Sequence, residues 1–204
     1  DRHRLIFIGS LIALILSLVL TGVAQVYNVL ALDVWFTREL QQQQRSLVVQ
    51  FMYAVSMFGY TPWSAISIAI GALIALWLAG WRAALYLTLI TIVQGVINLS
   101  IKAAIGRPRP VSSLVEVFVA EQGYSFPSGH VMFYTVFFGF LVFLTLTHVT
   151  NKVLRYGLVA FFGGLVLLVG PSRIILGSHW LSDVTAAYLL SLIILCLLYT
   201  SPSP

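Results

Sequence analysis

Two histidines and one aspartate have the residue types and spacing for covalent catalysis. His130 ends the turn PSGH, and His179 lies four residues before Asp183. On a helix, residues four apart lie on one face, one turn apart. Asp183 can then accept a proton from one imidazole nitrogen of His179 and leave the other free to attack. The spacing predicts that His179 is a nucleophile and that Asp183 orients it.

Three cations accompany these residues, namely Lys102, Arg109 and Arg173. Guanidinium groups match the oxygens of phosphate in pairs, and a lysine adds a point charge. The residue types therefore predict a binding site for a phosphoryl group. Arg107 fits two interpretations equally well, a phosphate contact or a plain loop cation, and the sequence leaves both open.

The turn PSGH at 127–130 is expected to open a helix. Backbone N–H groups of Ser128, Gly129 and His130 would point at an anion at the positive helix end, and Gly129 would let the backbone approach closely. His130 would then protonate a leaving oxygen. Taken alone, His130 is better interpreted as a histidine hydrogen-bonded between helices, so the acid role depends on the whole combination.

The composition places these polar residues in a membrane protein. Of 204 residues, 60% are hydrophobic and 8% are charged, whereas soluble domains carry about 25% charged residues. The net charge of +5 comes without a basic run, so we expect no nucleic-acid partner; it suits membrane orientation and an anionic ligand. The single cysteine, Cys196, excludes an internal disulfide and a cysteine-based metal cluster.

Crossing a bilayer takes about 20 mostly apolar residues in a helix. Six stretches of the chain meet that requirement, and they lie near Leu5–Val23, Pro62–Leu78, Ala83–Ile101, His130–Thr147, Val153–Val169 and Leu181–Leu198. The long connection from Gln25 to Thr61 has the pattern of an amphipathic helix lying in the membrane interface. We therefore expect an all-α polytopic membrane protein, with residues 1–204 forming six transmembrane helices in one bundle and a single domain.

The distribution of Lys and Arg predicts the orientation. One side of the membrane collects five cations: Arg2, Arg4, Arg82, Lys152 and Arg155. The other side holds Arg38 and Arg45, once the four cations beside the histidines are set aside for a ligand. Both termini are then cytoplasmic and the polar clusters share the outer face. Ionisable residues at membrane depth are costly and mark a functional site.

Several other polar and aromatic residues are interpreted as structural. We expect Glu116 and Glu121 to be solvated loop residues. Three tryptophans fit the interfacial aromatic belt: Trp63, Trp81 and Trp180. Two amides in the third span are suited to holding helices together: Gln94 and Asn98.

The combined motifs resemble those of a known family. Lys102 is followed after six residues by Arg109–Pro110, then comes PSGH, and then Ser172–Arg173, five residues, His179, three residues and Asp183. This order resembles the type 2 phosphatidic acid phosphatase (PAP2) family in all three signature motifs, with no signature position substituted. The resemblance covers residues 102–183, and the six-span plan extends it to the whole chain.

The resemblance implies a metal-independent phosphatase without cofactors that acts through a phosphohistidine. His179 would attack phosphorus, Asp183 would orient it, and His130 would protonate the leaving group and later activate water. The residues implied to bind the phosphoryl oxygens are Lys102, Arg109, Ser128, Gly129, Ser172 and Arg173.

A site at the membrane surface favours a lipid phosphate or diphosphate, whose tails stay in the bilayer. The favoured substrate is a polyprenyl diphosphate such as undecaprenyl diphosphate, with phosphatidic acid and phosphatidylglycerol phosphate next. This implies a bacterial inner membrane with the site on its outer face. Soluble vanadium haloperoxidases share the motifs, but six spans argue against that branch. The competing interpretation is an anion-binding transporter or channel without enzymatic activity.

Overall fold

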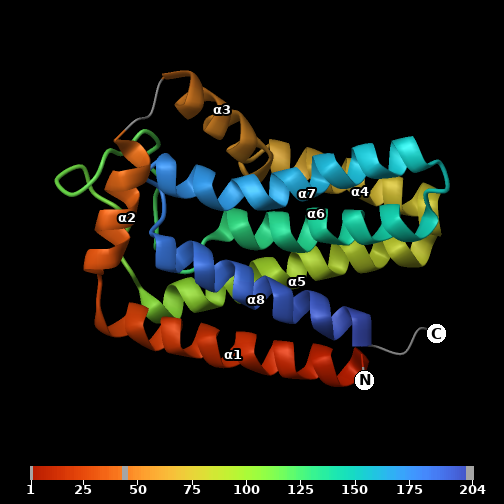
Figure 1. Ribbon diagram of the computed structural model, residues 1–204, viewed down its shortest axis with the longest axis horizontal. Helices are drawn as coiled ribbons and strands as arrows, with labels where there is room; N and C mark the ends of the chain where they lie inside the picture. Colours follow the sequence, from red (N-terminus) through yellow and green to blue (C-terminus); the bar gives the residue numbers. More distant parts are fainter. Residues whose placement is uncertain (1, 43–45, 201–204) are drawn as a thin grey trace.

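The structure, a computed structural model, describes residues 2–42 and 46–200, without the side chains of 2, 3, 5 and 197–200. These residues form helices and contain no strand, which confirms the all-α prediction. The elements, coloured along the chain in Figure 1, are α1 (Arg2–Val26), α2 (Ala31–Gln41), α3 (Ser46–Ser56), the short 3₁₀ helix η1 (Met57–Gly59), α4 (Trp63–Ala79), α5 (Trp81–Ile105), α6 (Gly129–His148), α7 (Lys152–Ile175) and α8 (Leu181–Thr200).

Helix α6 is the centre of the bundle and contacts α4, α5, α7 and α8. Its aromatic side chains fill the core, with the rings of Phe133 and Phe137 stacked 5.2 Å apart. The outer surfaces are apolar as well: Phe7 and Leu18 of α1 are largely exposed. An apolar exterior around an apolar core is what a bundle surrounded by lipid requires.

Among the described residues, four helices have the length and composition to cross a membrane: Ile6–Val26, Trp81–Ile105, Gly129–His148 and Lys152–Ile175. A fifth candidate is the pair formed by Ser46–Gly59 and Trp63–Ala79, which bends by 63° at the break. The apolar part of α8, Leu181–Cys196, is shorter. All six expected stretches are helical, but length and composition support four or five spans, so the count of six stays a prediction.

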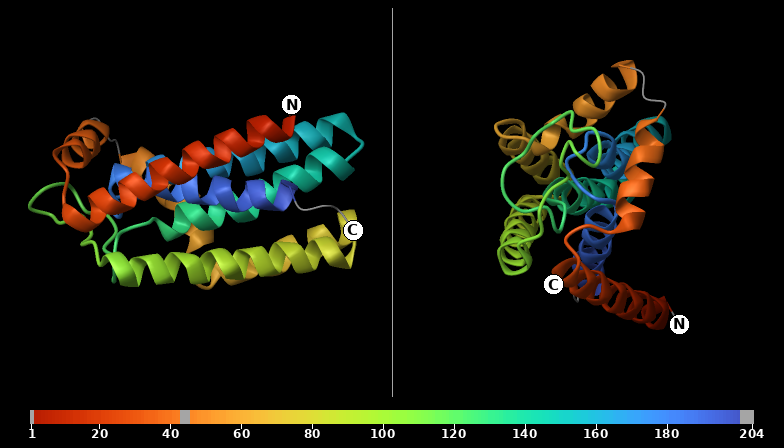
Figure 2. Two further views of the ribbon diagram at one scale, coloured as in Figure 1. Left: turned by 90° about the horizontal axis from the view of Figure 1, so that it is seen from below. Right: turned by 90° about the vertical axis from the view of Figure 1, so that its left-hand side faces the viewer.

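The expected single amphipathic helix between the first two spans is replaced by two helices. Helix α2 lies across one end of the bundle (Figures 1 and 2), whereas α3 packs against α7 and leads through η1 into α4. Residues 43–45, which include Arg45, lie outside the described part of the chain. The apolar residues of α3 are used for tertiary packing: Val55 is buried.

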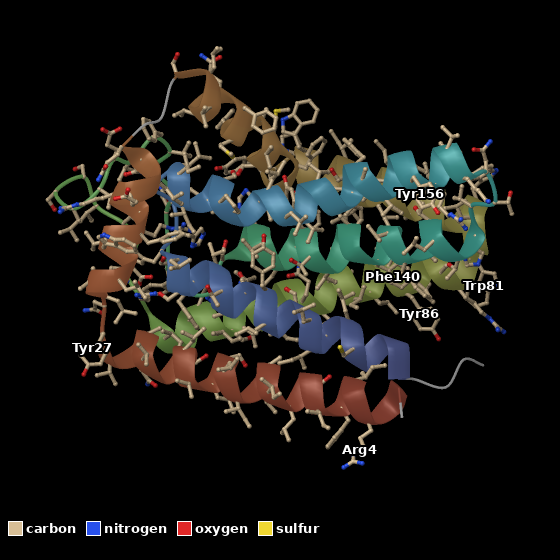
Figure 3. All side chains as sticks on the ribbon, viewed as in Figure 1. Arg4, Tyr27, Trp81, Tyr86, Phe140 and Tyr156 are labelled. Atoms are coloured by element: carbon tan, nitrogen blue, oxygen red, sulfur yellow. The ribbon has the colours of Figure 1, made fainter. Side chains whose placement is uncertain are left out.

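The connections divide between the two ends of the bundle. One end of the bundle holds the start of α1, the end of α8, and the α4–α5 and α6–α7 turns (Figure 1). In Figure 3 the labelled Trp81 marks this end, and Tyr27 marks the opposite end near α2. The Gly106–Ser128 loop and the α7–α8 turn gather at the α2 end, so motifs that are distant in sequence meet there.

Two glycines shape this end. Gly106 closes α5 in the left-handed conformation, with φ of 67°. Gly177 in the α7–α8 turn has φ of 68°, and a Cβ there would lie 2.1 Å from the carbonyl oxygen of Glu116. The turn therefore packs directly on the loop, and Phe118 N donates a hydrogen bond to Leu176 O at 3.1 Å.

Candidate active site

His179 is buried at the α2 end of the bundle, and its two ring nitrogens have different neighbours. Nε2 lies 3.1 Å from a guanidinium nitrogen of Arg109. Nδ1 lies 3.5 Å from Oδ2 of Asp183, close to hydrogen-bond distance. Arginine only donates hydrogen bonds, so Nε2 must accept, and the proton of the neutral ring belongs on Nδ1, facing Asp183. This tautomer leaves the Nε2 lone pair directed toward the cations.

The closeness of His179 and Asp183 comes from a turn, and the sequence-based reason for it was wrong. Helix α8 begins at Leu181, so only Asp183 lies on it and His179 precedes it. Asp183 Oδ2 accepts a hydrogen bond from Trp180 N at 2.9 Å, and that bond closes the turn. Trp180 itself is fully buried, so its assignment to the interfacial belt was also wrong.

Burial, followed by the positive charges of Arg109, Lys102 and Arg173, holds the pKa of His179 well below its ordinary value of 6.5. The cause is physical: an imidazolium would lose its hydration and sit beside cations. His179 is therefore neutral at neutral pH, which is the state a nucleophile needs.

Glu121 lies between the two arginines of the predicted phosphate site. One carboxylate oxygen is 2.9 Å from Arg109, and the other pairs with Arg173. Burial opposes the ionisation of Glu121, but the charges of Arg173, His179 and Arg109 outweigh it and lower the pKa of Glu121. The expectation of a solvated loop glutamate was wrong, because the loop folds this side chain inward onto the cations.

Lys102 and Arg109 are held by carbonyl groups of the same loop. Lys102 Nζ donates to the carbonyl oxygens of Tyr124 and Ser125, at 2.5 and 3.2 Å. Arg109 donates to those of Gly123 and Ser178, at 3.2 and 2.9 Å. The loop therefore sets the direction of both cations before any ligand binds.

His130 lies in the first turn of α6, as the PSGH motif predicts. Its ring packs against Gly59, where a Cβ would lie 2.2 Å from Cδ2, and against the edge of Tyr60 at 4.5 Å between centroids. Its ring lies within electrostatic range of Arg173, His179, Arg109 and Lys102, which would repel a positive charge on it. His130 thus belongs to the same cluster, and its Nε2 has no hydrogen-bond partner among the described residues.

Several buried polar atoms of this cluster have no hydrogen-bond partner among the described residues. They are Ser128 Oγ, His130 Nε2, Arg173 Nε and His179 Nδ1. Buried polar groups are normally paired, and each exception asks for an explanation. His179 Nδ1 faces Asp183, whereas the Ser128 hydroxyl, His130 Nε2 and the Arg173 Nε–H are groups of the kind that bind the oxygens of a tetrahedral anion.

Comparison with known families agrees with this geometry. A sequence profile described as the PAP2 superfamily matches residues 79–203, which is more than half of the chain. The chain belongs to the PAP2 superfamily. Comparison with curated proteins gives no match.

Two solved structures share the PAP2 fold of this chain. One is the transmembrane PAP2-type phosphatidylglycerolphosphate phosphatase from Bacillus subtilis, at 21% identity and a TM-score of 0.81, with 94% of each chain covered. The other is LpxE from Aquifex aeolicus, at 23% identity and a TM-score of 0.62, covering 83% of this chain and 97% of that one. At these identities the likeness establishes the fold.

The Ser172 hydroxyl and the Ser128 N–H were expected to bind a phosphoryl group, but both form hydrogen bonds within the protein. Ser172 is buried, and its hydroxyl donates to Met52 O at 2.8 Å and contacts Ser56 Oγ, so it faces α3. Ser128 N donates to Asp183 O at 3.2 Å, so this N–H is not free for an anion. Gly129 fits tightly, since a Cβ there would lie 3.1 Å from Oδ1 of Asn98.

Asn98 connects helices as expected. Its Nδ2 donates to Pro127 O at 3.1 Å and lies 3.2 Å from the sulfur of Met132. Gln94 is buried one turn earlier on α5. These contacts fix the start of α6, and with it His130.

Arg107 is neither a phosphate contact nor a plain loop cation. Its guanidinium is fully buried and pairs with Asp183 at 2.6 Å and with Asp33 of α2 at 2.8 Å. The sequence separates Arg107 from Asp33 by 74 residues, and no local pattern connects them. Within this PAP2 chain, Arg107 supports the carboxylate that faces His179.

Sequence reasoning also missed two residues of the α3–η1 segment. Arg173 donates to Tyr60 Oη at 2.7 Å and to Ser56 Oγ at 3.0 Å. Both residues lie outside the part matched by the PAP2 profile. The one usable signal was the polar serine and tyrosine beside Gly59 in an apolar stretch, which the interfacial-helix interpretation absorbed.

Proposed function

We propose that this chain is a metal-independent lipid phosphatase that hydrolyses a phosphate monoester or diphosphate through a phosphohistidine. One observation carries the proposal. His179, held in its neutral form, directs Nε2 toward Arg109 while Nδ1 faces Asp183. A nucleophile, its orienting carboxylate and the cations for a phosphoryl group are thus assembled around one ring.

In the first step, Nε2 of His179 attacks phosphorus, a P–N bond forms, and the P–O bond to the leaving group breaks. The ring acquires positive charge, which the Asp183 carboxylate stabilises. His130 gives its proton to the departing oxygen. Lys102, Arg109 and Arg173 stabilise the charge spread over the three equatorial oxygens, so catalysis is mostly positioning and electrostatics.

In the second step, water attacks the phosphohistidine and His130 accepts a proton from that water. The P–N bond breaks, inorganic phosphate leaves, and His179 returns to its neutral state. The Ser128 hydroxyl and the Arg173 Nε–H, both without a partner among the described residues, contribute to holding the phosphoryl oxygens in both steps, together with the backbone N–H of Gly129 at the start of α6. Ser172 acts at one remove, by fastening α7 to α3.

The position of the site supports a lipid substrate. The cluster lies at the end of an apolar bundle, where a headgroup can enter while its tails remain in lipid. Undecaprenyl diphosphate is our first candidate. Phosphatidic acid and phosphatidylglycerol phosphate follow, the last also because the Bacillus subtilis protein of the same fold is a phosphatidylglycerolphosphate phosphatase.

Phosphate release by purified protein in detergent tests this function. The substrates should share a headgroup and differ in their tails, all in the presence of EDTA. We expect EDTA-resistant release, and loss of at least about a thousandfold in His179→Ala. An active protein that stops in EDTA would contradict the metal-independent mechanism. Tight phosphate binding without release from any lipid would favour the transporter interpretation.

A further inference from the structure

The charge balance around Asp183 extends beyond the signature motifs to α2. Asp33, Arg107, Ser182 and Asp183 form a buried network in which each side chain is at most 7% exposed. Arg107 donates to Oδ1 of Asp183 and to Oδ2 of Asp33 through different nitrogens of one guanidinium. The two carboxylates therefore share a single cation, and the group of three carries one net negative charge.

Asp33 also binds the start of α8 directly. Its Oδ1 accepts from Ser182 N at 2.9 Å, and its Oδ2 accepts from Ser182 Oγ at 2.7 Å. Ser182 is the neighbour of Asp183, so α2 is fixed to the backbone that carries the carboxylate facing His179. Asp33 lies outside residues 79–203, the part matched by the PAP2 profile.

We propose that Asp33 is a positioning residue that keeps Asp183 available to His179 by sharing the charge of Arg107. This rests on the proposed phosphohistidine chemistry. A positive ring forms when His179 attacks, and Asp183 must stabilise it. If Arg107 were paired with Asp183 alone, its full charge would neutralise that carboxylate at 2.6 Å in a buried site, where charge interactions are strong.

The groups that face the His179 ring from all sides determine how this appears in a pH profile. They are Arg109 and Glu121 of the loop, Lys102 of α5, His130 of α6, Arg173 of α7 and Asp183 of α8. Of these groups around His179, only Asp183 has a hydrogen bond to the Asp33–Arg107 pair among the described residues. Loss of Asp33 should therefore weaken the negative charge beside Nδ1 and make His179 harder to protonate, without touching the phosphate-binding cations.

The direct test is Asp33→Asn, which keeps the shape and removes the charge. We expect kcat to fall about tenfold, the size of one charge-assisted hydrogen bond. The KM and the inhibition constant of inorganic phosphate should stay unchanged, and the acid limb of kcat/KM should move to lower pH. A purely structural role of Asp33 would not shift that limb.

Thr37→Val is the matched control. Thr37 lies one turn further along α2, is equally buried, and its hydroxyl has no partner among the described residues. We expect wild-type kinetics from this variant. If it loses as much activity as Asp33→Asn, docking of α2 explains the effect and the charge proposal is wrong.

The double variant Asp33→Asn with Arg107→Gln removes the shared cation as well. It should raise kcat above that of Asp33→Asn and return the acid limb toward its wild-type position, because Asp183 is no longer neutralised. Losses that simply add, or failure of both variants to fold by thermal unfolding, would overturn the proposal. A wild-type protein that releases no phosphate would instead refute the proposed function on which it rests.

Discussion

Glu121 is an anion already placed between Arg109 and Arg173. A substrate phosphate that uses these cations must displace this carboxylate or accept its repulsion. Glu121 therefore offsets the charge of both arginines, and phosphate binding exchanges one anion for another. This exchange costs affinity but keeps the buried Arg173 and the partly buried Arg109 directed at the same carboxylate.

Glu121→Gln should bind inorganic phosphate more tightly. Removing the competing charge is expected to lower the inhibition constant of phosphate by roughly fivefold, equivalent to about 1 kcal/mol. Competitive inhibition of turnover measures it. Glu116→Gln is the control, since Glu116 lies exposed on the same loop. Unchanged or weaker phosphate binding in Glu121→Gln would show that the carboxylate helps to hold the substrate.

The neutral state of His179 gives a prediction about pH. Since its pKa lies well below 6.5, the reactive form persists as pH falls through 6.5 and is lost only below it. We expect ¹⁵N ring shifts of a neutral imidazole at pH 6.5, assigned by comparison with His179→Ala.

Arg109→Gln removes the second-largest cause of that depression, after burial. The pKa of His179 should therefore rise, and the protonated ring should appear at higher pH than in the wild type. A ring that titrates near 6.5 in the wild type, or that does not respond to Arg109→Gln, would contradict this electrostatic account.

At the scale of elements, α3 and η1 build one side of the site. Tyr134 Oη of α6 donates to Val55 O at 2.5 Å, and Ser172 of α7 donates to Met52 O at 2.8 Å. The backbone at Gly59 then covers the ring of His130. The segment thus holds His130, the proposed general acid, by packing.

Gly59→Ala tests this packing. A Cβ at 2.2 Å from His130 Cδ2 forces the ring to move, and displacement of about 1 Å costs on the order of a hundredfold in rate. We expect that loss in kcat with little change in phosphate affinity. Gly163→Ala should behave as wild type, because nothing lies within 4 Å of its Cβ. Wild-type kcat in Gly59→Ala would show either that His130 takes no part in the mechanism or that η1 does not position it.

The helices were predictable because they are long and apolar. Helix α4, for example, runs over Trp63–Ala79 against an expected Pro62–Leu78. The packing of the segment before α4 was not predictable, because apolar residues spaced among polar ones fit an interfacial helix as well as a helix packed in the bundle. The gathering of His130, His179 and the cations was predictable from the residue types, whereas the contact of Ser172 with α3 was not. Asp33, Tyr60 and Glu121 were not, since their partners are distant in sequence and only the folded chain brings them together.

At the scale of the whole molecule, the fold separates a site end from the end where α1 begins. Five cytoplasmic cations were counted from the sequence, of which Arg2 lies outside the described side chains. If the positive-inside interpretation is correct, the site end faces outward. The same direction is required for a phosphatase that takes its headgroup from the outer leaflet.

Labelling of single cysteines measures this orientation. In a Cys196→Ser background, Ser113→Cys lies at the site end and Thr150→Cys in the opposite α6–α7 turn, both exposed. A thiol reagent that cannot cross membranes should label Ser113→Cys in intact bacterial cells, and Thr150→Cys only after permeabilisation. The reverse pattern would place the site in the cytoplasm.

The covalent intermediate tests the central claim most directly. Purified protein is mixed with a ³²P-labelled lipid phosphate, quenched within milliseconds in alkali, and digested for mass spectrometry. We predict an acid-labile phosphoryl group on His179 of the wild type, and none in His179→Ala. Rapid turnover with no label on any histidine, or with the label on another residue, would contradict the account.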